Sequence, residues 1–416
     1  MKLSTTQRVK RSRIYAMTRD IKWRLENYVS QDERRRFRVL SLAPKGPSKG
    51  DVLFSRLNRA FFLNPGGAIP PAHQNLWESY QMAMIFLELG YSVDVIDYTN
   101  NSFIPRKDYS IFLDVKWNME RIGPLLNKEC IKVLHAVTAN PLFQNAAEMH
   151  RLLALQQRRG VTLRPRRQDW LNWAIENADC ATVLGNEFTL STYRYAGKPM
   201  YSVPLASPTS YEWPKGKDFD RCRKDFLFFA GAGMVHKGLD LILEAFAGMP
   251  EASLTVCGPV EKETDFVAAF HRELYETENI HTVGWIDSSS AKFVEITNGC
   301  VALIHASCSE SGCASVITGM HAGLIPIVSY ESSVDVYPSF GVVLNSASVE
   351  DIRDAVRLVA NLEAPRLEEM ARTAWQQARQ RYSPENFTAE YKRAIDRILS
   401  SAHKSCTSPG PEVAFK

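Results

Sequence analysis

A glycine loop between a short apolar segment and an amphipathic helix pattern is the feature that most limits the possible folds. Residues 226–230 are apolar, and the loop after them contains Gly231, Gly233 and Lys237. From residue 239 onward, apolar side chains recur at the spacing of one helix face. Glycine lets a backbone approach a ligand, N–H groups at a helix start attract an anion, and lysine adds positive charge. The pattern therefore predicts a strand, a phosphate-binding loop and a helix.

The same arrangement recurs later in the chain, now with a carboxylate in the loop. Residues 307–315 (Ser-Cys-Ser-Glu-Ser-Gly-Cys-Ala-Ser) separate the apolar run 301–304 from a helix pattern at 315–322. A further strand pattern follows at 323–328. One loop is suited to phosphate, and Glu310 in the other can hold hydroxyl groups. Together they indicate a nucleotide-sugar pocket.

Strand and helix patterns alternate on both sides of a polar segment, which predicts two domains. The 416 residues exceed one ordinary core, and this alternation is typical of parallel sheets covered on both faces. Residues 44–75 are interpreted as loop-rich, and helices are predicted at 76–89 and 145–159. Predicted strands are 37–43, 91–97, 110–114, 131–135, 180–184, 226–230, 253–257, 280–283, 300–304, 325–329 and 340–344. The predicted organisation is a basic segment (1–35), an N-terminal domain (36–206), a linker (207–224), a C-terminal domain (225–382), a last helix (383–402) and a disordered tail (403–416).

Composition places the chain among globular proteins without a disulfide framework. Hydrophobic residues make up 45% of the chain, but no run of about 18 apolar residues predicts a membrane-spanning helix. Residues 1–10 lack the apolar core of a secretory signal. The eight cysteines form no C-x-x-C pair and mostly adjoin apolar runs, so we expect reduced core residues of a cytoplasmic protein. Cys308 and Cys313 are interpreted as packing residues, and no metal site is predicted.

The N-terminal segment is strongly basic. Residues 1–40 hold twelve Lys/Arg and four Asp/Glu, a net charge of +8, whereas the whole chain carries +4. Apolar positions between 14 and 28 would line one side of a helix. One interpretation is peripheral contact of residues 1–38 with anionic lipid at the inner membrane surface. The other is a helix that packs on its own domain with solvated arginines outside. Nucleic-acid binding is not expected, because no recognisable module accompanies the basic residues.

These motifs resemble those of retaining glycosyltransferases with the GT-B fold, in particular glycosyltransferase family 4, the group 1 glycosyl transferases. The resemblance covers most of the chain and is strongest in the second half. The residues that carry it there are Gly231 with 237–240, 279–280 with Gly284 and Trp285, and 307–310 followed by 323–328. In the first half they are Gly66, Gly67, 75–78, 90–94 and His135. The resemblance implies an α/β fold of two Rossmann-like, doubly wound parallel-sheet domains with a cleft between them.

The resemblance also implies roles for individual residues. Lys237 would hold the donor diphosphate and offset charge on the departing nucleotide, and Glu310 would hydrogen-bond the transferred sugar. His135 would face the reacting carbon from the acceptor side as a third catalytic residue. Donor contacts are implied for Gly231, Gly233, Gly284, Trp285, Gly312, Cys313, Ala314 and Thr318, and an acceptor-side loop for Gly66 and Gly67. A nucleotide sugar is the expected co-substrate, with no metal or other cofactor.

Two positions depart from the family pattern. The second acid of its E-x7-E pattern falls at Thr318, and its usual arginine after the glycine falls at Ala232. The predicted function is a cytoplasmic, metal-independent hexosyltransferase of polysaccharide biosynthesis with a glycan or lipid-linked glycan acceptor. The alternative is a weakly active or inactive nucleotide-sugar-binding protein. A nicotinamide enzyme is disfavoured because His236 holds the third glycine position of the dinucleotide motif. A glycosidase is disfavoured because we find no convincing second acid beside Glu310.

Overall fold

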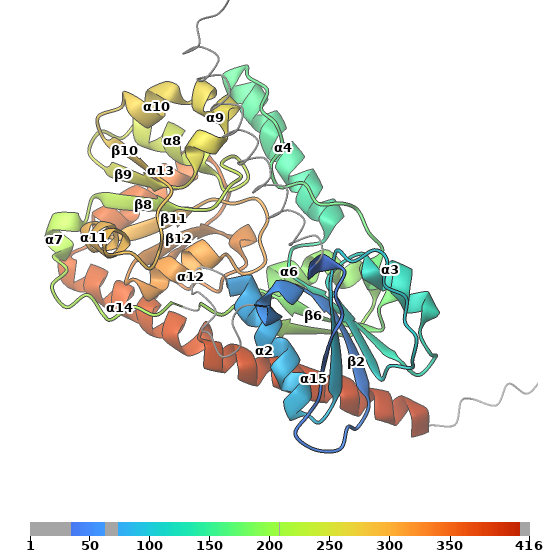
Figure 1. Cartoon of the computed structure of the whole chain (residues 1–416). Coiled ribbons are helices and arrows are strands. Elements are labelled where there is room, and N and C mark those ends of the chain that lie inside the picture. The colour runs from blue at the N-terminus through green and yellow to red at the C-terminus, as the bar shows by residue number, and fades with distance from the viewer. Residues whose placement is uncertain (1–34, 63–73, 208, 408–416) are drawn as a thin grey trace, which may run out of the picture.

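The computed structural model describes residues 35–62, 74–207 and 209–407, with side chains up to residue 401. These residues form two sheet domains (Figure 1). The predicted basic segment lies outside the described residues except for Arg35, as do Gly66, Gly67 and the end of the predicted tail, 408–416. Within the described ranges, no helix combines the length and the apolar character needed to span a membrane.

The first domain contains a seven-stranded sheet in the described part of the chain, in the order β1-β3-β2-β4-β5-β6-β7. All neighbouring strands are parallel except β1, which runs antiparallel to β3 at the edge. The strands are β1 (Leu40–Leu42), β2 (Asp51–Arg56), β3 (Ser92–Asp97), β4 (Ile111–Asp114), β5 (Ile131–Ala136), β6 (Cys180–Leu184) and β7 (Met200–Val203). The helices are α2 (Gln74–Glu88), α3 (Asn118–Ile122), α4 (Pro141–Arg159), α5 (Ala174–Asn177) and α6 (Glu187–Tyr193).

The second domain contains a six-stranded, fully parallel sheet in the described residues, in the order β10-β9-β8-β11-β12-β13. The strands are β8 (Asp225–Phe229), β9 (Ser253–Cys257), β10 (Ile280–Gly284), β11 (Ala302–His305), β12 (Ile325–Ser329) and β13 (Val342–Leu344). The helices are α7 (Phe219–Cys222), α8 (Leu239–Ala247), α9 (Thr264–Ala269), α10 (His271–Tyr275), α11 (Ala291–Gly299), α12 (Ala314–His321), α13 (Val349–Ala360) and α14 (Ala364–Arg381). Apolar side chains of these strands and helices form the core.

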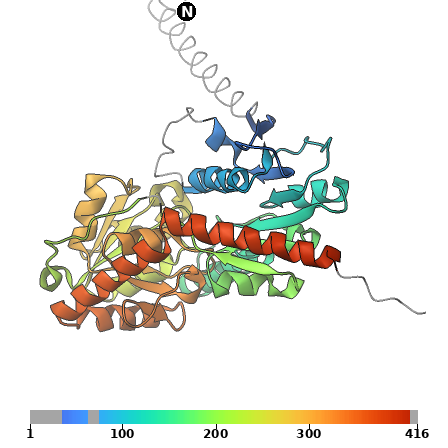
Figure 2. The ribbon, with the colours of Figure 1, turned by 90° about the horizontal axis from the view of Figure 1, so that it is seen from below.

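Two helices connect the domains. Helix α4 begins with Asn140, whose side chain caps Leu142 N, and ends at Gly160, which adopts a left-handed φ of 69°. It extends from the first domain to α9 and α10 of the second (Figure 1). Helix α15 (Pro384–Thr407) follows α14 and returns the chain to the first domain, where it packs on α2, β6 and β7 (Figure 2).

The predicted doubly wound α/β class is confirmed, and most predicted strands occur within two residues of their expected bounds. The interpretation of residues 44–75 as loop was wrong, because β2 lies there and pairs with both β3 and β4. Its apolar core is short, Val52 to Phe54, and glycines and prolines around it hide the pattern. The first strand is also shorter than predicted, Leu40–Leu42 instead of 37–43.

Candidate functional site

The loop after β8 delivers Lys237 to the carboxyl edge of the second sheet. Gly233 and Gly238 both have positive φ angles, 97° and 81°, and Lys237 N donates to Gly233 O at 2.8 Å. Glycine is required at 238, because a Cβ there would lie 2.3 Å from the carbonyl oxygen of Ala306. The loop is thereby pressed against the end of β11, and it precedes α8 directly.

The loop between β11 and α12 delivers Glu310 to the same place. Lys237 Nζ forms an ion pair with Glu310 Oε1, and the two side chains are only 9% and 11% exposed. They are 73 positions apart in sequence. The structure therefore brings together the two residues that the sequence marked as central, at the carboxyl ends of two adjacent parallel strands, where such sheets bind ligands.

The electrostatics of this pair favour the charged carboxylate. Burial acts to raise the pKa of Glu310, but the ammonium of Lys237 outweighs it with help from His236 and His305, so the pKa falls to about 2. Burial lowers the pKa of His236 to about 4 and that of His305 to about 3. At neutral pH the described group therefore consists of one ammonium, one carboxylate and two uncharged imidazoles.

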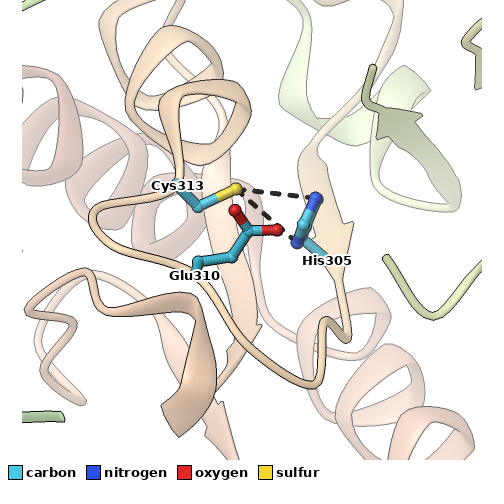
Figure 3. A group of neighbouring side chains, drawn as sticks. All are labelled: His305, Glu310 and Cys313. Atoms are coloured by element: carbon cyan, nitrogen blue, oxygen red, sulfur yellow. Dashed lines mark hydrogen bonds between the residues drawn. The ribbon is translucent and has the colours of Figure 1, made fainter. Parts of the chain in front are cut away.

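His305, Glu310 and Cys313 form a compact group beside the pair (Figure 3). Cys313 Sγ lies 3.7 Å from Nδ1 and 3.5 Å from Nε2 of His305. This near-equality puts the sulfur over the face of the ring and away from the in-plane lone pair of either nitrogen. Burial raises the pKa of Cys313 to about 12, and Lys237 already neutralises Glu310. The ligand atoms of these three side chains lie within 4.8 Å of one another, and the carboxylate among them is paired with the Lys237 ammonium.

Glu263, which the sequence did not single out, holds the glycine loop. Its buried carboxylate accepts from Gly233 N at 2.5 Å and from Met234 N at 3.2 and 3.3 Å. The N–H of Gly233 is thus occupied within the protein and is not free for a phosphate. Gly231, by contrast, is exposed, as is Ala232.

The start of α12 lies next to Glu310. Gly312 has a φ of 71° and packs against Gly185 of the first domain. Cys313 N donates to Ser332 O at 3.0 Å, whereas Ala314 is exposed. Thr318 lies further along the helix and is partly buried. Of these predicted contacts, Ala314 at the helix start is the most open to a ligand.

The predicted base contacts lie at the end of β10. Gly284 ends the strand with a φ of 84°, and the side chain of Trp285 is 64% exposed. An exposed indole at this edge offers a face on which a base can stack. Within the described residues, no hydrogen bond, ion pair or ring contact joins Trp285 to Lys237 or Glu310, so its role stays a prediction.

His135 occupies the interior of the first domain. It is fully buried, its Nδ1 lies 2.8 Å from Thr182 Oγ1, and its ring packs edge-on against Tyr391. Burial, followed by the positive charge of Arg56, lowers its pKa well below the usual value. None of these contacts involves Lys237 or Glu310, so the catalytic role of His135 stays a prediction.

Two other residues of the first domain contact the loop that carries Glu310. The carbonyl oxygen of Val137, just beyond β5, accepts from Ser311 Oγ at 2.5 Å. Thr189 Oγ1 donates to the backbone oxygen of Glu310 at 3.3 Å. Sequence reasoning missed both residues. The only available signal was for Val137, which follows His135 by two positions at the carboxyl end of the same strand.

The comparisons agree with this architecture. Residues 217–381 match the family model described as "Glycosyl transferases group 1". A search of curated proteins found no match. Sucrose-phosphate synthase from Thermosynechococcus elongatus is structurally similar, with a TM-score of 0.57 and 13% identity over 84% of this chain and 99% of that one. Anabaena Alr3699/HepE in complex with UDP gives a TM-score of 0.53 and 10% identity over 84% of this chain and 99% of that one.

The fold and the site thus define a two-domain α/β protein of the GT-B class. Within its second domain, residues 217–381 are similar to the glycosyl transferases group 1 family.

Proposed function

We propose that the protein is a retaining glycosyltransferase that moves a sugar from a nucleoside-diphosphate sugar to a glycan or lipid-linked glycan. The contact between Lys237 and Glu310 carries this proposal. It joins a cation suited to a diphosphate and a carboxylate suited to sugar hydroxyls in one group at the domain junction. The similarity of residues 217–381, which include both residues, to the group 1 family supports it further.

In the proposed reaction, the donor diphosphate approaches the Lys237 ammonium, which offsets the negative charge that builds as the nucleotide departs. Glu310 turns from Lys237 to accept hydrogen bonds from hydroxyl groups of the transferred sugar. The start of α12 at Ala314 adds N–H groups for an anion. The acceptor hydroxyl attacks from the face that the nucleotide leaves, and the departing phosphate takes its proton, so the configuration is retained.

We further propose that the reaction needs no metal ion, because lysine and the helix start supply the positive charge at the diphosphate. The proposed setting is cytoplasmic, in polysaccharide biosynthesis at the inner membrane surface. The basic residues near the N-terminus would assist the approach to a lipid-linked acceptor.

A catalytically weak or inactive nucleotide-sugar-binding protein is the second candidate. It is favoured by Thr318 in place of a second acid, and by the closed Lys237–Glu310 pair, which a donor must rearrange. Binding of a nucleotide sugar without transfer or hydrolysis is the outcome that this candidate predicts.

The test is turnover of UDP-, GDP- and ADP-sugars, with and without EDTA, and with the anomeric configuration of the product determined by NMR. Lys237→Ala and Glu310→Gln should each reduce turnover of the preferred donor at least about 100-fold, as expected for loss of one preorganised electrostatic group. Lys262→Ala, an exposed lysine in the same domain, is the matched control and should retain activity. Full turnover by either site variant would exclude the proposed site.

A further inference from the structure

The Lys237–Glu310 group leaves little free positive charge for a diphosphate. Lys237 and Glu310 neutralise each other as an ion pair. The neighbouring His236 and His305 are uncharged at neutral pH, because burial lowers their pKa values to about 4 and about 3. A nucleoside diphosphate carries several negative charges, so a further cation nearby would strengthen its binding beyond what Lys237 and the helix start supply.

Arg167 lies against the glycine loop although it belongs to the first domain. It is part of the segment between α4 and α5. A Cβ built on Gly233 would lie 2.6 Å from Cγ and 3.0 Å from Cδ of Arg167, so only glycine permits this approach. Burial is the main reason for the low pKa of His236, and the positive charges of Lys237 and Arg167 both add to it. Arg167 therefore acts electrostatically on the loop that carries Lys237.

The backbone of Arg167 is fixed, and its guanidinium has no protein partner in the ranges that the structure describes. Its N–H donates to Glu148 Oε1 at 2.9 Å, and its carbonyl accepts from Gln144 Nε2 at 2.6 Å. Both partners come from α4 and are buried. The preceding residue, Arg166, is by contrast paired with Asp265. A clamped backbone with a free, exposed guanidinium is suited to receive an anion.

We propose that Arg167 is a donor-binding residue contributed by the first domain, and that its guanidinium binds the diphosphate of the donor beside Lys237. The inference rests on the proposed function and extends it. It assigns the second cation of the diphosphate site to a segment some seventy residues before Lys237. In the glycine loop itself, the position of the family's usual arginine is held by the uncharged Ala232.

The planar guanidinium can donate two parallel hydrogen bonds to phosphate oxygens, which a lysine cannot do. A diphosphate held by Lys237 and Arg167 would also join the two domains. Donor binding would thereby add to the domain contact that Arg158 makes with Asp240 at 2.7 Å.

The test is titration calorimetry of the full chain with UDP, GDP and ADP, and the tightest of the three then serves as probe. Arg167→Ala should weaken the probe about 10- to 100-fold, the range for a hydrogen bond to a charged group. Arg167→Lys should give an intermediate loss, because it keeps the charge and loses the fork. Arg164→Ala, an exposed arginine of the same segment, is the matched control and should bind normally. Adding Ala232→Arg to Arg167→Ala should restore affinity, since residue 232 is exposed beside Gly231.

The outcomes distinguish failure of the Arg167 proposal from failure of the proposed glycosyltransferase function. Normal binding by Arg167→Ala overturns the role of Arg167 and leaves the proposed function intact. An equal loss in Arg164→Ala also overturns it, because the effect is then one of general charge. Absence of binding by the unmodified chain overturns the proposed function and this inference with it. Arg167 is exposed, so thermal unfolding of the variants should match that of the unmodified chain.

Discussion

Removal of the Glu263 carboxylate should destabilise the glycine loop and, through it, the second domain. Glu263 is 4% exposed and accepts from the N–H groups of Gly233 and Met234. In Glu263→Ala these two buried donors lose their acceptor. An unsatisfied buried donor costs about 1–3 kcal/mol, so the two together should lower the free energy of unfolding by about 2–6 kcal/mol. Glu263→Gln keeps an acceptor oxygen and should cost only about 1–2 kcal/mol.

Urea unfolding followed by tryptophan fluorescence measures the loss. Hydrogen-exchange mass spectrometry of residues 231–238 locates it, because loop amides should exchange faster in Glu263→Ala alone. Glu261→Ala is the matched control, since Glu261 is exposed two positions earlier. The reasoning would be refuted if Glu263→Ala were as stable as Glu261→Ala and if hydrogen exchange of residues 231–238 were unchanged.

Three further predictions concern other parts of the molecule. Burial lowers the pKa of His305 to about 3 in the folded protein, against the usual 6.5 of histidine. The unfolded chain therefore takes up the proton first, and stability falls as the pH drops below about 6.5. Between pH 7 and pH 4.5, the free energy of unfolding of His305→Asn should therefore fall by about 2 kcal/mol less than that of the unmodified chain, measured by urea unfolding. An equal fall in both proteins would contradict this. The guanidinium of Arg56 lies 2.8 Å from the Glu78 carboxylate, and Glu78→Ala leaves it buried without that partner. The substitution should lower the free energy of unfolding by about 3–5 kcal/mol. Thermal unfolding at the same temperature as the unmodified chain would contradict this. Trp285→Ala should leave stability within about 0.5 kcal/mol because the side chain is 64% exposed. It should weaken nucleoside-diphosphate binding about 10-fold if the base stacks there, and unchanged calorimetric affinity would remove Trp285 from the site.

The sequence predicts the periodic parts of the fold well. Strands β9 and β12 were predicted at their observed bounds, because an alternating apolar pattern in β9 and an apolar run in β12 both identify strands. The strand β2 was missed, since three apolar residues among turn formers resemble a loop. The meeting of Lys237 and Glu310 was predicted from the family resemblance, and the structure places both residues after adjacent strands of one parallel sheet.

The contacts across the domain junction could not be predicted in the same way. Arg167 and Gly233 approach each other from different domains, and nothing in the local pattern of either residue indicates the other. Glu263 lies 30 positions from the N–H of Gly233 that it binds. The environment of His135 likewise depends on Tyr391 of α15, which returns from the far end of the chain. Such partners follow from tertiary packing, which a single sequence does not encode locally.

The most direct test of the central claim is titration calorimetry with one nucleoside diphosphate and its sugar conjugate, on Lys237→Ala and Glu310→Gln side by side. If Lys237 holds the diphosphate and Glu310 holds the sugar, Lys237→Ala should weaken both ligands about 10- to 100-fold. Glu310→Gln should weaken only the sugar conjugate. Equal affinity of both variants and the unmodified chain for both ligands would contradict the account, because the ion pair would then be a structural contact outside the binding site.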